Sequence, residues 1–148
     1  MRAAYIEDVQ QWMNEFEFFV KVKVRFSETD MYGHLNNTVP FTYFEYARIE
    51  FFKSIGLMNN WTDKGKDTIP VVADLQCDYL KQVYFDEELQ IYVKIASIGT
   101  SSIDIHYIAK NDKNQPVFTG RGAIVQISRN SGKSVPWTTH ENQLLHGK

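Results

Sequence analysis

One short polar segment, residues 27–37, gathers most of the side chains that could carry out chemistry. It holds a carboxylate, an imidazole, two amides and a glycine: Asp30, His34, Asn36, Asn37 and Gly33. A helix-like run starts directly after it, so free backbone N–H groups and the positive end of a helix dipole lie close by. A helix N-terminus stabilises a developing oxyanion, and a neighbouring carboxylate can act as nucleophile or general base. These residue types in this order indicate acyl transfer or hydrolysis.

Each of these side chains also has a structural alternative. Asp30 could order a turn through nearby amides, and His34 could hold the loop by a hydrogen bond. Asn37 could cap the helix with its side chain, which is compatible with a catalytic role for its backbone N–H. Glu45 and Arg48 lie three residues apart on the helix, a spacing that pairs opposite charges. The residues alone leave these alternatives open.

The elements that must position this segment are a strand before it and a long helix after it. Residues 20–26 alternate apolar and basic side chains, which is typical of a strand with one wet face. Residues 38–55 are apolar on nearly every side, which indicates a helix enclosed by the rest of the fold. Asn37 or Thr38 can begin this helix, and Gly56 ends it.

Four further runs with strand-like patterns follow the helix: residues 69–83, 89–96, 103–107 and 117–128. The first is long enough to be bent, and Gly120 and Gly122 in the last indicate a bulge or a close approach of another segment. The short turns between the runs favour an antiparallel sheet. The order strand, helix, four strands predicts an α+β fold with the helix across one face of the sheet.

The remaining segments are expected at the surface. Residues 57–68 are rich in polar side chains and predict a loop. Residues 5–14 predict a short helix that rests on the domain, with Ile6, Val9 and Met13 on one side.

Length and composition limit the range of functions. The chain has 148 residues, is 43% hydrophobic and has a formal charge of -2, which fits one compact domain that is not held to nucleic acid by bulk charge. Cys77 is the only cysteine, which excludes an internal disulfide, and without an evident base partner it is expected to be a core thiol. No apolar run reaches the length of a membrane span and no signal peptide is evident, so a cytoplasmic protein is expected.

Sequence motifs of several common enzyme classes are not found. There is no phosphate-binding loop, dinucleotide fingerprint, serine-hydrolase elbow or zinc-protease motif. The four histidines are scattered without the spacing of metal ligands: His34, His106, His140 and His146. No metal and no cofactor is therefore expected.

The segments Val24 to Asp30 and Gly33 to Asn37 together resemble the signature of 4-hydroxybenzoyl-CoA thioesterase-like proteins, which have the hotdog fold. The similarity continues into the helix as Tyr43 to Glu50 and spans about residues 22–56. The resemblance implies a curved antiparallel sheet wrapped around one long helix, which would account for a helix that is apolar on nearly every side. It also implies that paired sheets form a dimer with active sites between subunits.

The same resemblance implies roles for individual residues. An aspartate at the place of Asp30 attacks the thioester carbonyl or activates a water, and a backbone N–H seven residues later, that of Asn37, polarises the carbonyl. The Gly-His-Leu-Asn-Asn run is more similar to the branch that acts on long-chain acyl-CoA and acyl-carrier-protein thioesters, in which His34 and Asn36 support the base or the water. In a sister branch the acid lies on the helix, where this chain has Glu45.

The expected protein is therefore a thioesterase that hydrolyses an acyl-CoA or acyl-carrier-protein thioester to an acid and a thiol. A single domain over residues 1–148 is expected, with an N-terminal extension at 1–18 and a polar tail at 130–148, assembled as a homodimer or homotetramer. Basic residues that could meet coenzyme A phosphates are Lys81, Arg121, Arg129 and Lys133. Two alternatives remain: a non-catalytic acyl-CoA-binding module, and a hotdog dehydratase or hydratase, whose signature the residues match less well. No nucleic-acid partner and no membrane span are expected.

Overall fold

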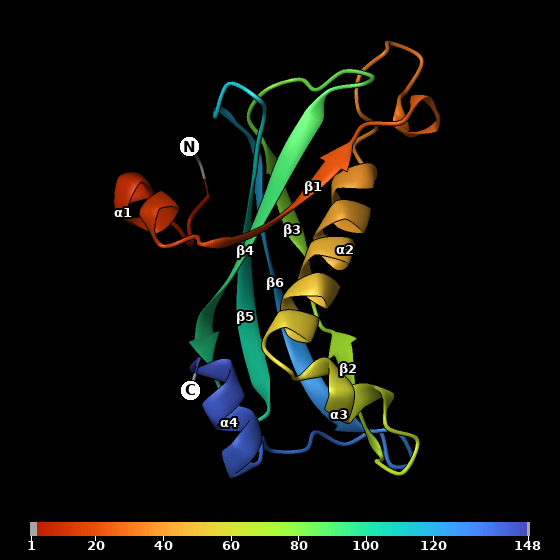
Figure 1. Cartoon of the computed structure of the whole chain (residues 1–148), viewed down its shortest axis with the longest axis vertical. Helices are drawn as coiled ribbons and strands as arrows, with labels where there is room; N and C mark the ends of the chain where they lie inside the picture. Colours follow the sequence, from red (N-terminus) through yellow and green to blue (C-terminus); the bar gives the residue numbers. More distant parts are fainter. Residues whose placement is uncertain (1–2, 148) are drawn as a thin grey trace.

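The computed structural model describes residues 3–147 and contains one six-stranded antiparallel sheet (Figure 1). Its strands are β1 (Phe18–Lys23), β2 (Thr68–Val72), β3 (Gln76–Tyr79), β4 (Glu88–Ile98), β5 (Ser102–Lys110) and β6 (Pro116–Ser128). The sheet order is β1-β4-β5-β6-β2, and β3 also pairs with β6. Met1, Arg2 and Lys148, which belong to the expected domain of residues 1–148, lie outside the described residues.

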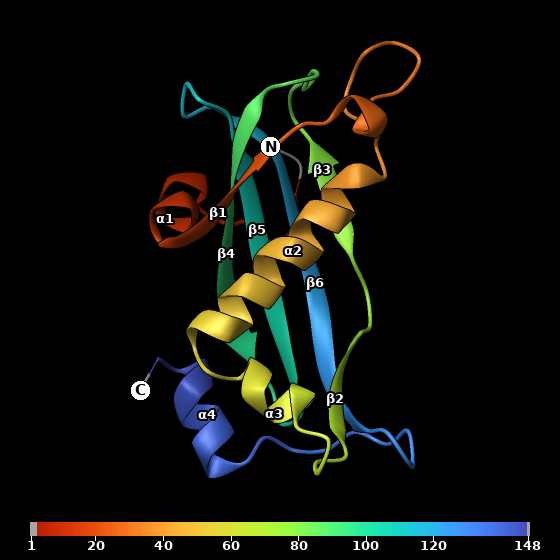
Figure 2. The same cartoon turned by 45° about the vertical axis from the view of Figure 1, so that its right-hand side comes forward.

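Helix α2 (Val39–Ser54) lies diagonally across one face of this sheet, and the short helix α3 (Met58–Thr62) follows it (Figure 2). Alternate residues of β5, including Ile103 and Tyr107, belong to the same buried core as the helix. The Phe44 ring of α2 stacks on Tyr107, with ring centroids 4.3 Å apart. A curled antiparallel sheet that holds one long helix is the hotdog fold, so the predicted α+β class and architecture are confirmed.

Two glycines of β6 let neighbouring segments approach the sheet closely. A Cβ atom at Gly120 would lie 2.4 Å from the Phe44 ring, and one at Gly122 would lie 2.6 Å from the Asp74 carbonyl oxygen. The pairing of β5 with β6 runs without a register shift from Ser102 to Ala109, a stretch that includes both glycines. Of the two predicted roles for these glycines, the close approach is confirmed and the bulge is wrong.

Helix α2 is enclosed on the side that faces the sheet. Tyr43, Phe44 and Ala47 are buried, whereas Glu45 is exposed and Tyr46 is 47% exposed on the opposite side. The prediction that the helix is buried on every side is therefore confirmed for the side that faces the sheet. It is wrong for the opposite side, which is exposed in the single chain.

The strand predicted at residues 20–26 ends earlier than expected. β1 keeps the predicted alternation up to Lys23, and the chain then forms a 3-10 turn at Phe26–Glu28 because the Glu28 carboxylate accepts a hydrogen bond from the Arg25 N–H. The Phe26 side chain is 77% exposed and packs edge-on against Phe85. Its predicted place on the buried face of the strand is wrong.

The segment between α2 and β4 contains more structure than its polar composition indicated. Leu57 and Trp61 are buried, four residues apart, and the helical turns of α3 place both against the core, so the predicted loop at 57–68 is wrong in this part. The long run at 69–83 is bent, as predicted, and divides into β2 and β3.

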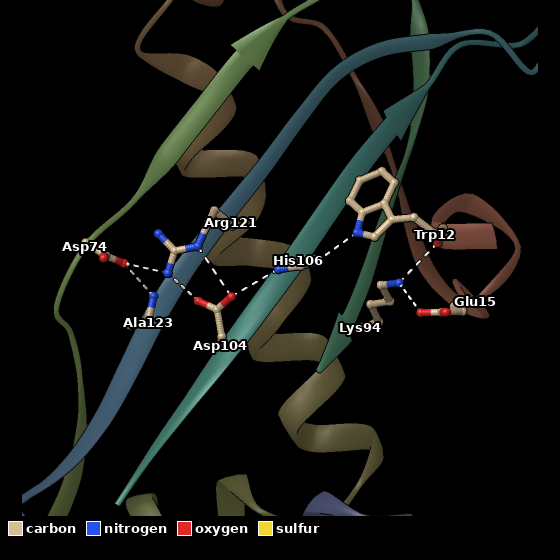
Figure 3. A network of polar contacts seen from close by, with 8 residues as sticks. All are labelled: Trp12, Glu15, Asp74, Lys94, Asp104, His106, Arg121 and Ala123. Carbon is tan, nitrogen blue, oxygen red and sulfur yellow. Dashed lines mark hydrogen bonds and ion pairs between the residues drawn. The ribbon is translucent and has the colours of Figure 1, made fainter. Parts of the chain in front are cut away.

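The N-terminal segment packs on the face of the sheet opposite α2 (Figure 1). Helix α1 (Val9–Asn14) buries Trp12, whose indole N–H donates to His106 Nδ1 at 2.8 Å (Figure 3). Ile6 and Met13 pack beside this indole, but Val9 is 39% exposed. The helix predicted at 5–14 begins only at Val9, so Met13 packs from the helix as expected while Ile6 packs from the chain before it.

The tail after Arg129 is polar overall, but it packs against the rest of the fold. It forms helix α4 (Thr139–Leu145), and Trp137 and Leu145 are both buried in the main core. These two apolar side chains, widely spaced in a polar segment, attach the tail to the sheet. No helix between residues 3 and 147 is long and apolar enough to cross a membrane.

Candidate active site

The predicted catalytic segment folds into a tight turn that the Asp30 side chain organises. Its Oδ1 accepts hydrogen bonds from the backbone N–H groups of Tyr32 at 2.9 Å and His34 at 3.1 Å. Gly33 occupies the turn with a φ of +79°, a conformation that L side chains rarely adopt. The structural alternative for Asp30 is confirmed, but it uses Oδ1 alone: within residues 3–147, no hydrogen bond reaches Oδ2.

Three of the predicted residues border one cavity of about 310 Å³ at the N-terminal end of α2: Asp30, His34 and Asn37. The other walls come from the chain between β3 and β4 and from the core, and include Tyr79, Leu80, Lys81, Gln82, Val83 and Phe118. Apolar walls with a few polar groups at one end are typical of small-molecule sites.

The start of α2 leaves the Asn37 backbone N–H available to a ligand. Asn36 Oδ1 accepts from the N–H and the hydroxyl of Thr38, both at 3.0 Å, and the Asn36 carbonyl accepts from Val39. The Asn37 N–H makes no hydrogen bond in the described part of the chain. Asn36 therefore orders the start of the helix with its side chain. The sequence had instead predicted this role for the side chain of Asn37 or Thr38. Asn36 does not border the cavity.

The Tyr79 hydroxyl fixes the adjoining peptide by donating a hydrogen bond to the Asn37 carbonyl. Tyr79 lies on β3 and borders the cavity. Burial raises the pKa of Tyr79 to about 12, so the hydroxyl keeps its proton near neutral pH and remains a donor. No sequence pattern signals this contact, because the two residues are 42 positions apart.

His34 borders the cavity without bonding the Asp30 carboxylate through its ring. The imidazole packs edge-on against Tyr84, with ring centroids 5.1 Å apart, and the backbones of the two residues form an isolated β-bridge. The His34 N–H is one of the two donors to Asp30 Oδ1. The His34 backbone therefore helps to hold the loop, but within residues 3–147 the imidazole makes no hydrogen bond, so the predicted structural hydrogen bond of the side chain is not found.

Glu45 borders a second, separate cavity of about 200 Å³ and does not reach the one that contains Asp30. Its Oε2 lies 3.6 Å from Arg48 Nη2, the ion pair that the spacing of the two residues predicted. The ion-pair alternative is therefore confirmed, and a second catalytic carboxylate at Glu45 stays a prediction.

Glu28 anchors the predicted catalytic segment to α2, a role that sequence reasoning missed. Its Oε1 accepts hydrogen bonds from the Arg25 N–H at 2.9 Å and from the Tyr43 hydroxyl at 2.8 Å. Burial, together with the neighbouring carboxylate, raises the pKa of Tyr43 above its ordinary value, so the hydroxyl remains a donor. The carboxylate and the phenol are 15 residues apart, and only the folded turn brings them together.

A larger hollow of about 670 Å³ lies on the other side of α2, against β1. Its two carboxylates already have partners: Asp86 lies 3.3 Å from the Lys23 ammonium, and Glu28 accepts from Tyr43. Asn37, whose N–H makes no hydrogen bond within residues 3–147, does not border this hollow. The cavity that contains Asp30 is therefore the better candidate for an active site.

Two further sequence expectations concern Cys77 and the basic residues. Cys77 packs against the core, and burial raises its pKa to about 12, so it is a thiol rather than a thiolate, as expected. Lys81 borders the Asp30 cavity. Arg121 instead forms ion pairs with Asp104 and Asp74 in the polar network of Figure 3, so it is not free to bind a coenzyme phosphate at the cavity.

Comparisons with known proteins show which family the chain is similar to. A family model described as the Thioesterase-like superfamily matches residues 24–143. Uncharacterized protein YsmA from Bacillus subtilis (strain 168) is 51% identical over 145 residues, which cover 97% of this chain and 96% of that protein. The chloroplastic acyl-acyl carrier protein thioesterase ATL3 from Arabidopsis thaliana is 28% identical over 118 residues, covering 78% of this chain and 60% of that protein. A thioesterase from Thermus thermophilus, solved in complex with coenzyme A and zinc, superposes with a TM-score of 0.75 at 26% identity, covering 89% of this chain and 94% of that one.

Proposed function

Because the chain belongs to the thioesterase-like superfamily, we propose that it hydrolyses an acyl-CoA or acyl-carrier-protein thioester to a free acid and a thiol. The family match over residues 24–143 supports thioester hydrolysis in general. Two relatives support coenzyme A and acyl carrier protein as the carriers of the acyl group. One was solved with coenzyme A, and the other is named as an acyl-acyl carrier protein thioesterase.

The observation that carries the proposal is that Asp30 borders the same cavity as Asn37, whose backbone N–H makes no hydrogen bond within residues 3–147. In the proposed reaction the thioester carbonyl oxygen accepts a hydrogen bond from the Asn37 N–H, beside the positive end of the α2 dipole, which stabilises the oxyanion. Asp30 Oδ2 either attacks the carbonyl carbon or removes a proton from the attacking water. Direct attack expels the thiolate and leaves a mixed anhydride with Asp30, which water then hydrolyses to the free acid. In the other route the activated water adds to the carbonyl carbon and the thiolate is expelled. In both routes the thiolate takes up a proton and leaves as the thiol.

We assign supporting roles to the residues that hold these two groups in place. Gly33 provides the backbone turn around the Asp30 carboxylate, and Asn36 orders the first amides of α2. His34 faces the cavity where its imidazole can bind a water or the substrate. Glu45 receives no step, since it borders a separate cavity. A homodimer or homotetramer in the cytoplasm is proposed as the working form.

The test is acyl-CoA hydrolysis, followed by release of free thiol, in wild type and in Asp30→Asn. Asparagine keeps the Oδ1 that accepts from Tyr32 and His34, so the turn is expected to persist while the carboxylate is removed. Turnover is expected to fall by about 10²- to 10⁴-fold, the contribution of a general acid–base group.

Asp63→Asn is the matched control for that test, because Asp63 also orders a turn through Oδ1, which accepts from the Gly65 N–H at 2.9 Å. It lies in an exposed loop outside the cavity, so its activity is expected to equal that of wild type. Undiminished turnover in folded Asp30→Asn contradicts the proposal. Binding of acyl-CoA without turnover at every chain length favours the non-catalytic binding module instead.

A further inference from the structure

The cavity that contains Asp30 also has a lysine at its border. Among the described residues that line it, Asp30 is the one carboxylate and Lys81 the one lysine or arginine. Asp30 has a part in the proposed reaction, and Lys81 has none. Because Lys81 is an exposed residue, it lies where the cavity meets solvent and a substrate can reach it.

The turn between β5 and β6 holds the Lys81 side chain in place. The Lys81 ammonium donates a hydrogen bond to Gln115 Oε1 at 2.8 Å. The same oxygen accepts from the side-chain amide of Asn111 at 3.0 Å, and Asn111 Oδ1 accepts in return from the Gln115 N–H at 3.0 Å. Asn111 is 6% exposed, so the support of Gln115 is itself buried. A side chain that is oriented before a ligand arrives loses less conformational entropy on binding.

The backbone of Lys81 is attached to the sheet as well. The N–H groups of Leu80 and Lys81 both donate to the Val117 carbonyl oxygen, each at 3.0 Å. Val117 lies on β6 and is 1% exposed. The two ends of the lysine side chain therefore both have partners that belong to the folded core.

The Lys81 ammonium nevertheless has no anionic partner. None of the ion pairs formed within residues 3–147 includes Lys81. Lys23 and Lys53, by contrast, lie 3.3 Å from Asp86 and 3.0 Å from Glu50. An ammonium has three N–H donors, so two remain for a ligand after the bond to Gln115. A positioned cation without a counter-charge, beside a candidate active site, favours an anionic group on the substrate.

We infer that Lys81 binds a phosphate group of the carrier that presents the acyl group to Asp30. The inference rests on the proposed thioesterase function and names a substrate contact of the same site. Coenzyme A and acyl carrier protein share a phosphopantetheine arm, in which two amide units separate the thioester sulfur from a phosphate. With the thioester between Asp30 and Asn37, that arm must leave the cavity toward solvent, where Lys81 is exposed. A lysine binds phosphate as a point charge.

The test compares octanoyl-phosphopantetheine with octanoyl-pantetheine, two thioesters that differ only in the phosphate. Wild type is expected to favour the phosphorylated thioester in kcat/KM by about two- to fivefold, the range of an exposed ion pair, and added salt is expected to lower this ratio. Lys81→Met is expected to bring the ratio close to one, and Lys81→Arg is expected to keep most of it because the charge remains.

Lys113→Met is the matched control, because it removes an exposed cation of the same β5–β6 turn that does not border the cavity. It is expected to keep the wild-type ratio. A loss of that ratio in Lys113→Met as large as in Lys81→Met would assign the effect to the general charge of this surface and overturn the inference.

Octanoyl-CoA separates the two sources of phosphate. A loss in Lys81→Met with octanoyl-CoA and octanoyl-phosphopantetheine alike supports contact with the phosphate that both carriers share. A loss with octanoyl-CoA alone supports contact with the nucleotide phosphates of coenzyme A. An equal loss with octanoyl-pantetheine, or no preference of wild type for either phosphorylated thioester, overturns the inference while hydrolysis itself stands.

The site can also be tested if none of these thioesters is hydrolysed, an outcome in which the proposed function fails. The Tm shifts caused by phosphopantetheine, coenzyme A and pantetheine then decide. A larger shift with either phosphorylated compound in wild type, lost in Lys81→Met, supports the phosphate contact. Equal shifts with all three compounds overturn it.

Discussion

The Tyr79 hydroxyl on β3 donates a hydrogen bond to the carbonyl of Asn37, directly before helix α2. Both residues border the cavity that contains Asp30. The bond connects a short strand of the sheet to the peptide that adjoins the proposed oxyanion donor. The sheet therefore holds the peptide that directly follows the Asn37 N–H and restrains the backbone at this donor.

Tyr79→Phe is expected to lower kcat for acyl-CoA hydrolysis by about tenfold, because the Asn37 peptide loses the bond that orients it and a displaced donor stabilises the oxyanion less well. Phenylalanine keeps the ring packing, so KM and stability are expected to change little. Steady-state kinetics with thiol detection measures the effect. Tyr84→Phe is the control, since its hydroxyl donates to Gln82 rather than to the helix start. An equal loss in both variants contradicts the assignment.

Tyr43→Phe is expected to lower the free energy of unfolding by about 1.5–3 kcal/mol, because it removes a hydrogen bond to the Glu28 carboxylate and keeps the buried ring. Urea denaturation measures the change. Tyr46→Phe on the exposed side of α2 is the matched control and is expected to be neutral. A neutral Tyr43→Phe would show that the loop is held to the helix by other contacts.

Gly120→Ala is expected to destabilise the fold by about 1–3 kcal/mol, the cost of overpacking a core. The new methyl group would lie 2.4 Å from the Phe44 ring and 2.8 Å from the Gln76 carbonyl oxygen, so α2 or β3 must move. Thermal unfolding followed by circular dichroism measures the loss. Gly65→Ala, whose methyl group would meet the Asp63 carboxylate at 3.3 Å in an exposed loop, is the comparison and is expected to cost less. Equal losses of stability in the two variants would mean that α2 can shift away from β6 without an energetic penalty.

The contact between Trp12 and His106 predicts a pH dependence of stability. Trp12 donates to Nδ1, so in the neutral ring Nε2 carries the proton and faces Asp104 at 3.0 Å. Burial lowers the pKa of His106 below its ordinary value, although Asp104 opposes the shift. The native state therefore binds fewer protons than the unfolded state, and this contribution is present above about pH 6.5 and is lost as the pH falls through the lower folded pKa.

Urea denaturation at about pH 7 and about pH 5 tests this prediction: wild type is expected to lose more stability on acidification than His106→Gln does. His140→Gln, at an exposed histidine, is the control and is expected to follow wild type. Parallel pH profiles for wild type and His106→Gln would contradict the assignment of this histidine.

The parts of the fold that depend on local pattern were predictable from the sequence. Leu89, Ile91 and Val93 alternate with polar residues and all lie buried on β4, as expected of a strand with one packed face. Helix α2 was predictable from its apolar length, although the open side that carries Glu45 and Tyr46 was not. A pattern reports how apolar a side is and does not report whether a partner covers it.

The candidate site was predictable only where it is contiguous in the chain. Asp30, His34 and Asn37 fall within eight consecutive residues, so their spacing was informative. The contact of Tyr79 depends on strand pairing, and the contact of Lys81 with Gln115 depends on a turn 34 residues further along the chain. Neither cause produces a recognisable residue spacing in the sequence. Trp137 was missed for the same reason, since one tryptophan in a polar tail does not show what it will pack against.

Strand β6 pairs with β2, β3 and β5, although it follows all three along the chain. During translation, β2 and β3 therefore leave the ribosome before the strand that satisfies their backbone groups exists. The sheet beneath α2 cannot close until Pro116 to Ser128 have been synthesised, which makes folding dependent on contacts of high sequence separation. Until then the nascent chain exposes apolar helix and strand edges, so its yield in cells is expected to depend on temperature and on chaperones more than the stability of the finished fold would indicate.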